Sequence, residues 1–379
     1  MTGPSDVVFT YSLETLDDSR ARGFARPPGR MLQTLLRSSR VGRVLVVDAE
    51  RSILSLARHG RSPWPEGLGA PRPHLRPWRW RRLGPTEPAS ATEHANRTDA
   101  MIAKAVVRHD LDHPALITFD PLLAGLASAD WARSVTYYGR DDWASYPPRE
   151  PWWPAYEAAY AGLRSTERAV LAISHPLIEK IAPTGPSAVV PNGIDPEEWR
   201  NPSAPPAWFA ALPRPILTYV GTVDDRVDEA LIAQLAGLEG SVALIGPCPD
   251  SDRRARLVAL GATLGAAASR AEVAAIVHHS DVGLIPHTRS SLTAAMSPLK
   301  LYEYRAAGLP VASVDLPPIA AEAAEDSRII LSEDRAGGFA ESARAALATG
   351  RDDEHDRGHY IDRTSWAGRH EAALDIIFR

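Results

Sequence analysis

The chain has 379 residues, of which 44% are apolar and 23% charged, and its formal net charge is -5. This composition is typical of a globular protein with enough apolar residues for two domains, and the charge gives no reason to expect nucleic acid as a partner. Cys248 is the only cysteine, which excludes a disulfide framework and a thiolate metal cluster. The N-terminus lacks the layout of a signal peptide, and no apolar run approaches the roughly 20 residues that span a bilayer. We therefore expect a soluble protein of the cytoplasm, attached to the inner face of a membrane at most peripherally.

Short apolar runs alternate with helix-length periodic segments along most of the chain, which predicts parallel sheets in an α/β architecture. In the first half we expect strands at residues 7–10, 43–48, 115–119, 134–138, 169–174 and from 188, and helices at 31–38, 96–109 and 154–168. The run at 43–48 is almost entirely apolar, as expected for a strand that is covered on both faces.

An irregular segment rich in Pro and Arg extends from about residue 60 to 90. Within it Arg and Trp alternate from Arg76 to Arg82, so a strand there would have one cationic and one aromatic edge. One interpretation is contact with anionic groups of an acceptor or a membrane surface. We favour a second one, an exposed Arg face over packed Trp side chains. Nucleic-acid binding has the least support, because the patch is short and the chain is acidic.

Asp141 and Asp142 follow the expected strand at 134–138, at the edge where the loops of an α/β sheet bind ligands. Two adjacent carboxylates repel each other, so one of them can titrate upward and act as a general base. It is equally consistent with the sequence that one Asp caps the next helix or turn and the other is solvated. Asp120 is a weaker candidate, because Asp-Pro is a routine turn.

A stretch rich in Pro and Ala at residues 201–214 marks a domain boundary, and a second α/β series follows it. We expect its strands at 216–220, 241–246, 261–265, 281–286, 310–314 and 328–331, and its last helices at 335–348 and 365–378. The predicted domains are residues 1–195 and 196–359.

Gly221 ends the first strand of this second series, where a glycine lets a ligand approach the backbone, and Arg226 in the same loop could clamp a phosphate. His287 follows another strand end and is a further binding candidate, but we favour a structural role for it. The chain contains neither GxGxxG nor GxxxxGK[ST], so a dinucleotide dehydrogenase and a P-loop enzyme have no support.

The segment from Ser297 to Val311 predicts one helix followed by a strand. Ser297 suits the N-cap and the following Pro the first helical position, while Gly308 can end the helix. Lys300 and Glu303 share one face. A helix start with a lysine favours phosphate, and a carboxylate one turn deeper can accept hydrogen bonds from ribose hydroxyls. An exposed Lys/Glu pair on an amphipathic helix remains the alternative.

Several motifs in this half resemble those of the GT-B glycosyltransferases, particularly bacterial enzymes that build exopolysaccharides, teichuronic-type polymers or decorated metabolites. The matching residues are Val190-Pro191-Asn192-Gly193-Ile194-Asp195, Tyr219-Val220-Gly221-Thr222, Asp281-Val282-Gly283-Leu284-Ile285-Pro286 and Ser297-Pro298-x-Lys300-x-x-Glu303-Tyr304-x-Ala306-x-Gly308-x-Pro310-Val311. The resemblance is strong over about residues 190–315. It implies two Rossmann-like domains with parallel sheets facing across a cleft, and a C-terminal helix, within residues 360–379, that crosses back to the first domain.

The resemblance further implies a hexosyl transfer from a nucleotide diphosphate sugar of the UDP, GDP or dTDP type to a hydroxyl of a glycan, lipid-linked glycan or natural product. Lys300 and Arg226 would contact the diphosphate, Glu303 the ribose, and Gly221 would let the loop pass close to the phosphates. The first domain would bind the acceptor. Ser297 and His287 complete the expected donor site, and no metal is expected.

One departure from the family pattern concerns the mechanism. Many retaining members have a second glutamate eight positions before the ribose-binding one, and here that position is Ala295. We therefore favour inversion, with Asp141 or Asp142 deprotonating the acceptor hydroxyl. Two alternatives remain, an epimerase of nucleotide sugars with the same fold and a non-catalytic partner of another transferase.

Overall fold

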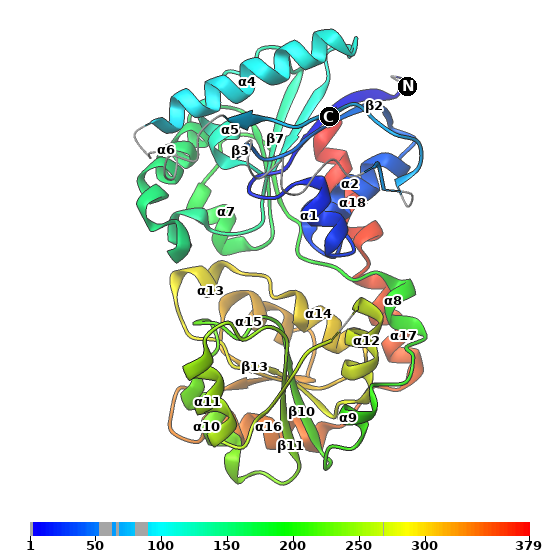
Figure 1. The fold of residues 1–379 in the computed structure, drawn as a ribbon, viewed down its shortest axis with the longest axis vertical. Coiled ribbons are helices and arrows are strands. Elements are labelled where there is room, and N and C mark those ends of the chain that lie inside the picture. Colours follow the sequence, from blue (N-terminus) through cyan, green and yellow to red (C-terminus); the bar gives the residue numbers. More distant parts are fainter. Residues whose placement is uncertain (1–2, 53–62, 66–67, 80–89, 268) are drawn as a thin grey trace. The chain divides into compact units, whose positions relative to one another are not determined.

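The computed structural model describes residues 3–52, 63–65, 68–79, 90–267 and 269–379. The chain divides into two compact units (Figure 1). Unit 1 contains Met1–Pro191 and His370–Arg379, and unit 2 contains Asn192–Arg369. The chain thus leaves the first unit after Pro191 and returns to it at His370, within its last helix.

Unit 1 is built on a seven-stranded sheet with the order β4-β2-β1-β6-β7-β8-β9, in which all pairs are parallel. Its strands are β1 (Ser5–Thr10), β2 (Val41–Val47), β4 (His74–Leu75), β6 (Ala115–Thr118), β7 (Ser134–Gly139), β8 (Ala169–Ala172) and β9 (Ser187–Val189). The helices are α1 (Leu16–Ala21), α2 (Pro27–Arg37), α4 (Ala91–Arg108), α5 (Pro121–Leu126), α6 (Trp153–Arg164), α7 (His175–Ile181) and the end of α18 (Trp366–Ile377), with 3-10 turns η3 (Trp143–Ser145) and η4 (Pro147–Trp152). β3 (Arg51–Ser52) and β5 (Trp78–Arg79) form a separate parallel pair.

Unit 2 is built on a six-stranded parallel sheet with the order β12-β11-β10-β13-β14-β15. Its strands are β10 (Ile216–Val220), β11 (Ser241–Ile245), β12 (Thr263–Gly265), β13 (Val282–Ile285), β14 (Val311–Val314) and β15 (Ile329–Ser332). The helices are α8 (Pro196–Arg200), α9 (Ala207–Ala210), α10 (Glu229–Gln234), α11 (Ser251–Ala259), α12 (Arg270–His279), α13 (Ser291–Ala295), α14 (Leu299–Ala306), α15 (Pro317–Ala323), α16 (Gly338–Thr349) and α17 (Glu354–Arg363), with a 3-10 turn η5 (Leu235–Gly237).

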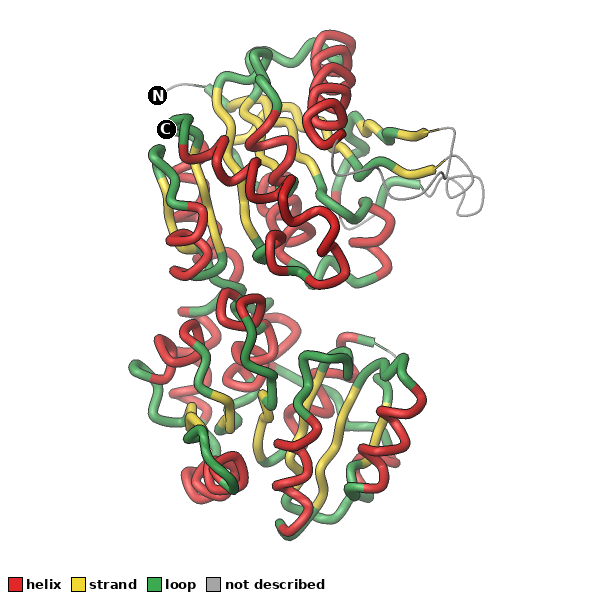
Figure 2. The backbone as a smooth tube through the Cα atoms, turned by 90° about the vertical axis from the view of Figure 1, so that its left-hand side faces the viewer, coloured by secondary structure: helices red, strands yellow, loops and turns green. Residues whose placement is uncertain are grey.

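Helices cover both faces of each sheet (Figures 1 and 2), which explains why the strands are apolar without alternation. In β1, Val7 and Phe9 pack into the cluster that α2 and α18 complete, whereas Val8 between them packs into the cluster that α4 completes. In unit 2, Leu217 and its neighbour Ile216 likewise belong to different clusters. The α/β fold class predicted from the sequence is therefore confirmed.

Several local predictions were wrong for identifiable reasons. Helix α2 begins at Pro27 and not near the expected residue 31, because Pro27 and Pro28 occupy its first turn, where a missing N–H has no cost. Ser297 does not cap α14, whose N-cap residue is Pro298 with no side-chain cap. Gly308, in contrast, ends that helix with φ +75°, as predicted.

The Arg/Trp segment is not one continuous strand over its described part. His74–Leu75 pairs with β2, whereas Trp78–Arg79 pairs with β3 in a different sheet. Arg76 between them donates from Nε to Nδ1 of His74 over 3.3 Å. Residues 80–82 lie outside the described residues, so membrane contact through the Arg76–Arg82 segment stays a prediction. No helix of the described residues combines the length and the apolarity that a membrane span requires.

Candidate functional site

In unit 2, the loops after β10 and β13 meet beside the start of α14. The sequence candidates Gly221 and Arg226 lie on the first loop and His287 on the second, and Lys300 lies in the first turn of α14. The backbone fixes these two loops to each other. Val227 and His287 form an antiparallel bridge, and the N–H of Thr288 donates to the carbonyl of Arg226 over 2.8 Å. Loops at the carboxyl ends of parallel strands thus bring together residues that are about 60 to 80 positions apart in the sequence.

Gly221 lies against Lys300 and has a left-handed backbone, with φ +144°. A Cβ at this position would lie 3.4 Å from Cε of Lys300 and 3.2 Å from the hydroxyl of Tyr219. Both the backbone conformation and the close approach of these side chains therefore favour glycine here.

Lys300 is half-buried, and its neighbours include the neutral ring of His287 and the cation of Arg226. Its Nζ lies 3.2 Å from Nε2 of His287 and 4.8 Å from the ring centroid of Tyr219. Burial and then the charge of Arg226 lower the pKa of Lys300 to about 7, although Glu303 and Asp224 act in the opposite direction. A bound anion would reverse this shift.

Arg226 is held beside Lys300 by a bidentate pair with Asp224. Its Nε donates to Oδ1 over 2.9 Å and its Nη2 to Oδ2 over 2.6 Å. Burial alone would raise the pKa of Asp224, but the hydrogen bonds and charge of Arg226 outweigh it and lower that pKa. Asp224 therefore fixes the position of the Arg226 guanidinium, a contact that was not predicted from the sequence. Its place two residues before Arg226 was the available signal.

His287, the third side chain of this group, is 1% exposed. Burial, followed by the charges of Lys300 and Arg226, lowers the pKa of His287 well below 6.5. The ring is thus neutral at physiological pH and can accept a hydrogen bond from the Lys300 ammonium. Nδ1 of His287 has no hydrogen-bond partner among the described residues.

Ser297 is brought to the base of α14 but not into contact with Lys300. Its hydroxyl accepts from the N–H of Asn192 over 3.3 Å and lies 3.1 Å from the hydroxyl of Tyr302, while the Asn192 amide donates to its carbonyl over 2.5 Å. Ser297 therefore anchors the start of the helix to the segment that enters unit 2. No side chain caps the first turn of α14.

Glu303 lies one turn deeper in α14, is 4% exposed, and forms an ion pair of 2.7 Å with Arg270. Arg270 is the first residue of α12 and also pairs with Glu198 over 2.9 Å. It further lies over the ring of Trp199 at 6.0 Å from the centroid. Arg270 was not predicted from the sequence, because it lies 33 residues before Glu303 and no local pattern links the two residues.

In unit 1, the acidic pair after β7 has two different environments. Asp142 is 1% exposed, and its Oδ1 accepts from the N–H of Ala144 over 3.2 Å, which caps η3. Its Oδ2 accepts from Nζ of Lys180 over 2.7 Å. The side chain of Asp141 is 34% exposed and lies 3.7 Å from Nε of Arg140. The capping alternative thus describes Asp142.

Asp120 follows β6 at the same edge of the sheet and caps α5 by accepting from the N–H of Leu122 over 3.0 Å. Burial raises the pKa of Asp120, against the opposing effect of His94.

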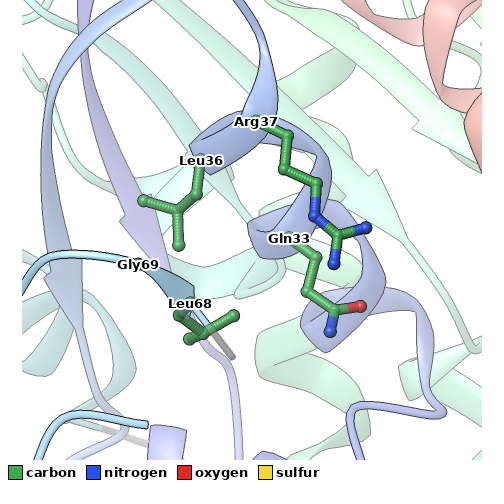
Figure 3. Close-up of a pocket in the computed structure, with 5 residues that line it drawn as sticks. All are labelled: Gln33, Leu36, Arg37, Leu68 and Gly69. Atoms are coloured by element: carbon green, nitrogen blue, oxygen red, sulfur yellow. The ribbon is translucent and has the colours of Figure 1, made fainter. Parts of the chain in front are cut away.

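A pocket of unit 1 lies beside the second half of α2 and is lined by Gln33, Leu36, Arg37, Leu68 and Gly69 (Figure 3). None of the candidate residues lines it. Within the described ranges, no group of three or more His, Cys, Asp or Glu side chains is arranged to hold a metal ion.

No family model and no curated protein matches the sequence. The structure is similar to a sucrose-phosphate synthase of Thermosynechococcus elongatus, with a TM-score of 0.69 and 12% identity over 99% of this chain and 98% of that one. It is also similar to a trehalose-6-phosphate synthase, with a TM-score of 0.65 and 14% identity over 98% of both chains. A third similar structure is AviGT4, a glycosyltransferase of avilamycin A biosynthesis, with a TM-score of 0.56 and 12% identity over 99% of this chain and 98% of that one. The chain therefore has the GT-B fold of glycosyltransferases, as its motifs predicted.

Proposed function

We propose that the protein is a glycosyltransferase that moves a hexosyl group from a nucleotide diphosphate sugar to a hydroxyl of an acceptor. The observation that carries this proposal is the position of Lys300 in unit 2. Its ammonium lies beside Arg226 and the neutral His287 rather than against a carboxylate, at the uncapped start of a helix. Two cations and free helix N–H groups are the features that bind a diphosphate.

Each donor-site residue then has a defined part in the reaction. Lys300 and Arg226 neutralise the charge that develops on the diphosphate as the glycosidic bond breaks, and Gly221 lets the phosphates approach the backbone. Glu303 accepts hydrogen bonds from the ribose hydroxyls, sharing its carboxylate with Arg270. His287 and Ser297 hold Lys300 and the helix start in place. We expect this site to need no metal ion.

For transfer to the acceptor, we propose inversion of the anomeric configuration, with an aspartate after β7 as the base. The reason is Ala295, which stands where many retaining members have a second glutamate. The base removes the proton of the acceptor hydroxyl while the oxygen attacks the anomeric carbon and the nucleotide diphosphate departs. Asp141 suits this role better than Asp142, because both oxygens of Asp142 already accept hydrogen bonds within unit 1. The trehalose-6-phosphate synthase cited above is described with transfer by retention, so the anomeric configuration of the product is the direct test.

The first experiment is a thermal-shift screen with UDP, GDP, dTDP and ADP. It is needed because AviGT4 and the other similar structures do not identify the nucleobase of this protein's donor. At least one nucleotide should raise the melting temperature of the wild type. Absence of any shift with all four would overturn the proposal. An epimerase of the same fold would convert the nucleotide sugar without an acceptor, which NMR of an acceptor-free reaction would detect. A non-catalytic partner would bind the nucleotide and release no product.

A further inference from the structure

Helix α12 packs against two other helices of unit 2, α14 and α8 (Figure 1). Its first residue, Arg270, contacts a carboxylate on each of them. Nη1 of Arg270 lies 2.7 Å from Oε1 of Glu303 on α14, and Nη2 donates to Oε2 of Glu198 on α8 over 2.9 Å. Carboxylates from two different helices therefore share one guanidinium group.

The Arg270 guanidinium is fixed from the side of α8. Its Nε also donates to Oε2 of Glu198, over 3.3 Å, and the group lies 6.0 Å from the ring centroid of Trp199. Trp199 is fully buried and stacks on the ring of His278, with the ring planes 28° apart. The carbonyl of Trp199 accepts from Nη1 of Arg357 over 2.8 Å and lies 3.0 Å from Nε2 of His278. Arg270 is thus supported by a residue that is itself held on several sides.

Glu303 has unused capacity to accept hydrogen bonds. A carboxylate offers roughly four acceptor sites on its two oxygens. The described residues give no hydrogen bond to Oε2 of Glu303, and the side chain is 5% exposed, so water has little access to it. Hydroxyl groups of a ligand can supply the donors that the protein does not.

We propose that Arg270 is a positioning residue for the donor: it holds Oε1 of Glu303, so that the carboxylate presents Oε2 to the ribose hydroxyls. This inference rests on the proposed function, because it takes Glu303 as the ribose-binding residue. Asp224 fixes the cation of Arg226 in a comparable way, through a bidentate pair. A group that is ordered before the ligand arrives binds more tightly, because binding does not have to order it.

The test measures how strongly the protein distinguishes a nucleotide from its 2′,3′-dideoxy form, which lacks the ribose hydroxyls. Calorimetric titrations with UDP, GDP, ADP and dTDP, each beside its 2′,3′-dideoxy form, give a ratio of dissociation constants for each pair. For a nucleotide that binds, this ratio should be about 10 or more in the wild type. Arg270→Gln should lower it about fivefold or more, because a carboxylate that loses its cation turns towards water or another cation.

Arg256→Gln is the matched control, because it also removes an arginine of unit 2 that pairs with a glutamate, Glu229, at 2.8 Å. It should keep the wild-type ratio. Arg270→Lys serves if the neutral variant does not fold, since lysine keeps the charge but lacks the fork that reaches both glutamates. Its ratio should also be lower than that of the wild type.

The ratio separates a positioning role from a purely structural one. If Arg270 only stabilises the fold, Arg270→Gln weakens the binding of both ligands equally and leaves the ratio unchanged, which would overturn the inference. A higher ratio would also overturn it, because Arg270 would then compete with the ribose for Glu303. When Glu303→Gln is already present, adding Arg270→Gln should not lower the ratio further. A further decrease would show that Arg270 does not act through Glu303.

The same titrations distinguish failure of this inference from failure of the proposed function. If no nucleotide binds the wild type, the transferase proposal fails and the role of Arg270 fails with it. If a nucleotide binds and Arg270→Gln keeps the wild-type ratio, only the role of Arg270 is refuted and the transferase proposal stands.

Discussion

The pKa of Lys300 predicts that donor affinity depends on pH in a defined direction. Burial and Arg226 lower this pKa to about 7 in the free protein, so the ammonium is lost as pH rises through neutrality. A bound diphosphate favours the charged form and raises the pKa. Donor binding therefore takes up a proton above pH 7, and affinity should fall as pH increases.

The magnitude follows from the fraction of Lys300 that is protonated in the free protein. With a pKa of about 7, that fraction is roughly nine tenths at pH 6 and one tenth at pH 8. If the bound diphosphate keeps Lys300 charged, affinity should decrease about tenfold over this range. The neighbouring titratable groups should not change protonation over this pH range, so the pH dependence of donor affinity reports on Lys300. His287 stays neutral because its pKa is well below 6.5, and the lowered pKa of Asp224 keeps it ionised.

The assay is calorimetric titration with a nucleotide diphosphate sugar at several pH values between 6 and 8.5. A diphosphate diester is the right ligand, because it has no phosphate proton that titrates in this range, unlike free UDP. Lys300→Met should bind the donor about 10- to 100-fold more weakly at pH 6 and lose the pH dependence. Lys104→Met, on the exposed face of α4, is the matched control and should behave like the wild type.

Lys300→Met should also change the stability of the free protein, in the direction opposite to its effect on donor binding. Lys300 is desolvated and close to another cation, so its charged form destabilises the unliganded protein. Lys300→Met should therefore raise the melting temperature of the free protein at pH 6, while it weakens donor binding. Equal donor affinity at pH 6 and pH 8 in the wild type would refute the assignment of Lys300 as a diphosphate ligand.

Four further variants test the remaining roles. Glu303→Gln should reduce the preference for UDP over 2′,3′-dideoxy-UDP, and an unchanged preference would show that Glu303 does not contact the ribose. Asp141→Asn should lower kcat about 10²- to 10⁴-fold with little change in melting temperature, whereas Asp142→Asn should mainly lower the melting temperature, because it leaves Lys180 without its 2.7 Å carboxylate partner. Asp224→Asn should release Arg226 and raise the KM for the donor more than it changes kcat; an unaffected KM would show that the bidentate pair is not needed.

The sequence predicted the fold because parallel strands covered on both faces produce a local signal. The expected strand at 281–286 appears as Val282–Ile285, and the one at 310–314 as Val311–Val314. The candidate positions Gly221 and His287 follow from the same signal, since each lies just after a predicted strand end. Once parallel strands are placed, their carboxyl ends must lie at one edge of the sheet.

The parts that the sequence did not predict depend on contacts between distant segments. Nothing near Asp142 indicates that its partner is Lys180, 38 positions later. Ser297 is a residue type that commonly caps a helix, but its hydroxyl instead accepts from the N–H of Asn192, 105 positions earlier, and lies 3.1 Å from the hydroxyl of Tyr302. In both cases the local interpretation was chemically reasonable, and a tertiary contact determined the outcome.

The proposed donor site has a physical property that the structural ion pairs lack. Arg305 is buried between Asp326 and Asp352, at 2.7 Å from each, so its charge is compensated within the fold. Lys300 instead lies beside a neutral histidine, and burial and the charge of Arg226 together lower its pKa. A cation held in this way costs stability in the free protein, and a bound anion relieves that cost. This is what a binding site for a nucleotide diphosphate would require.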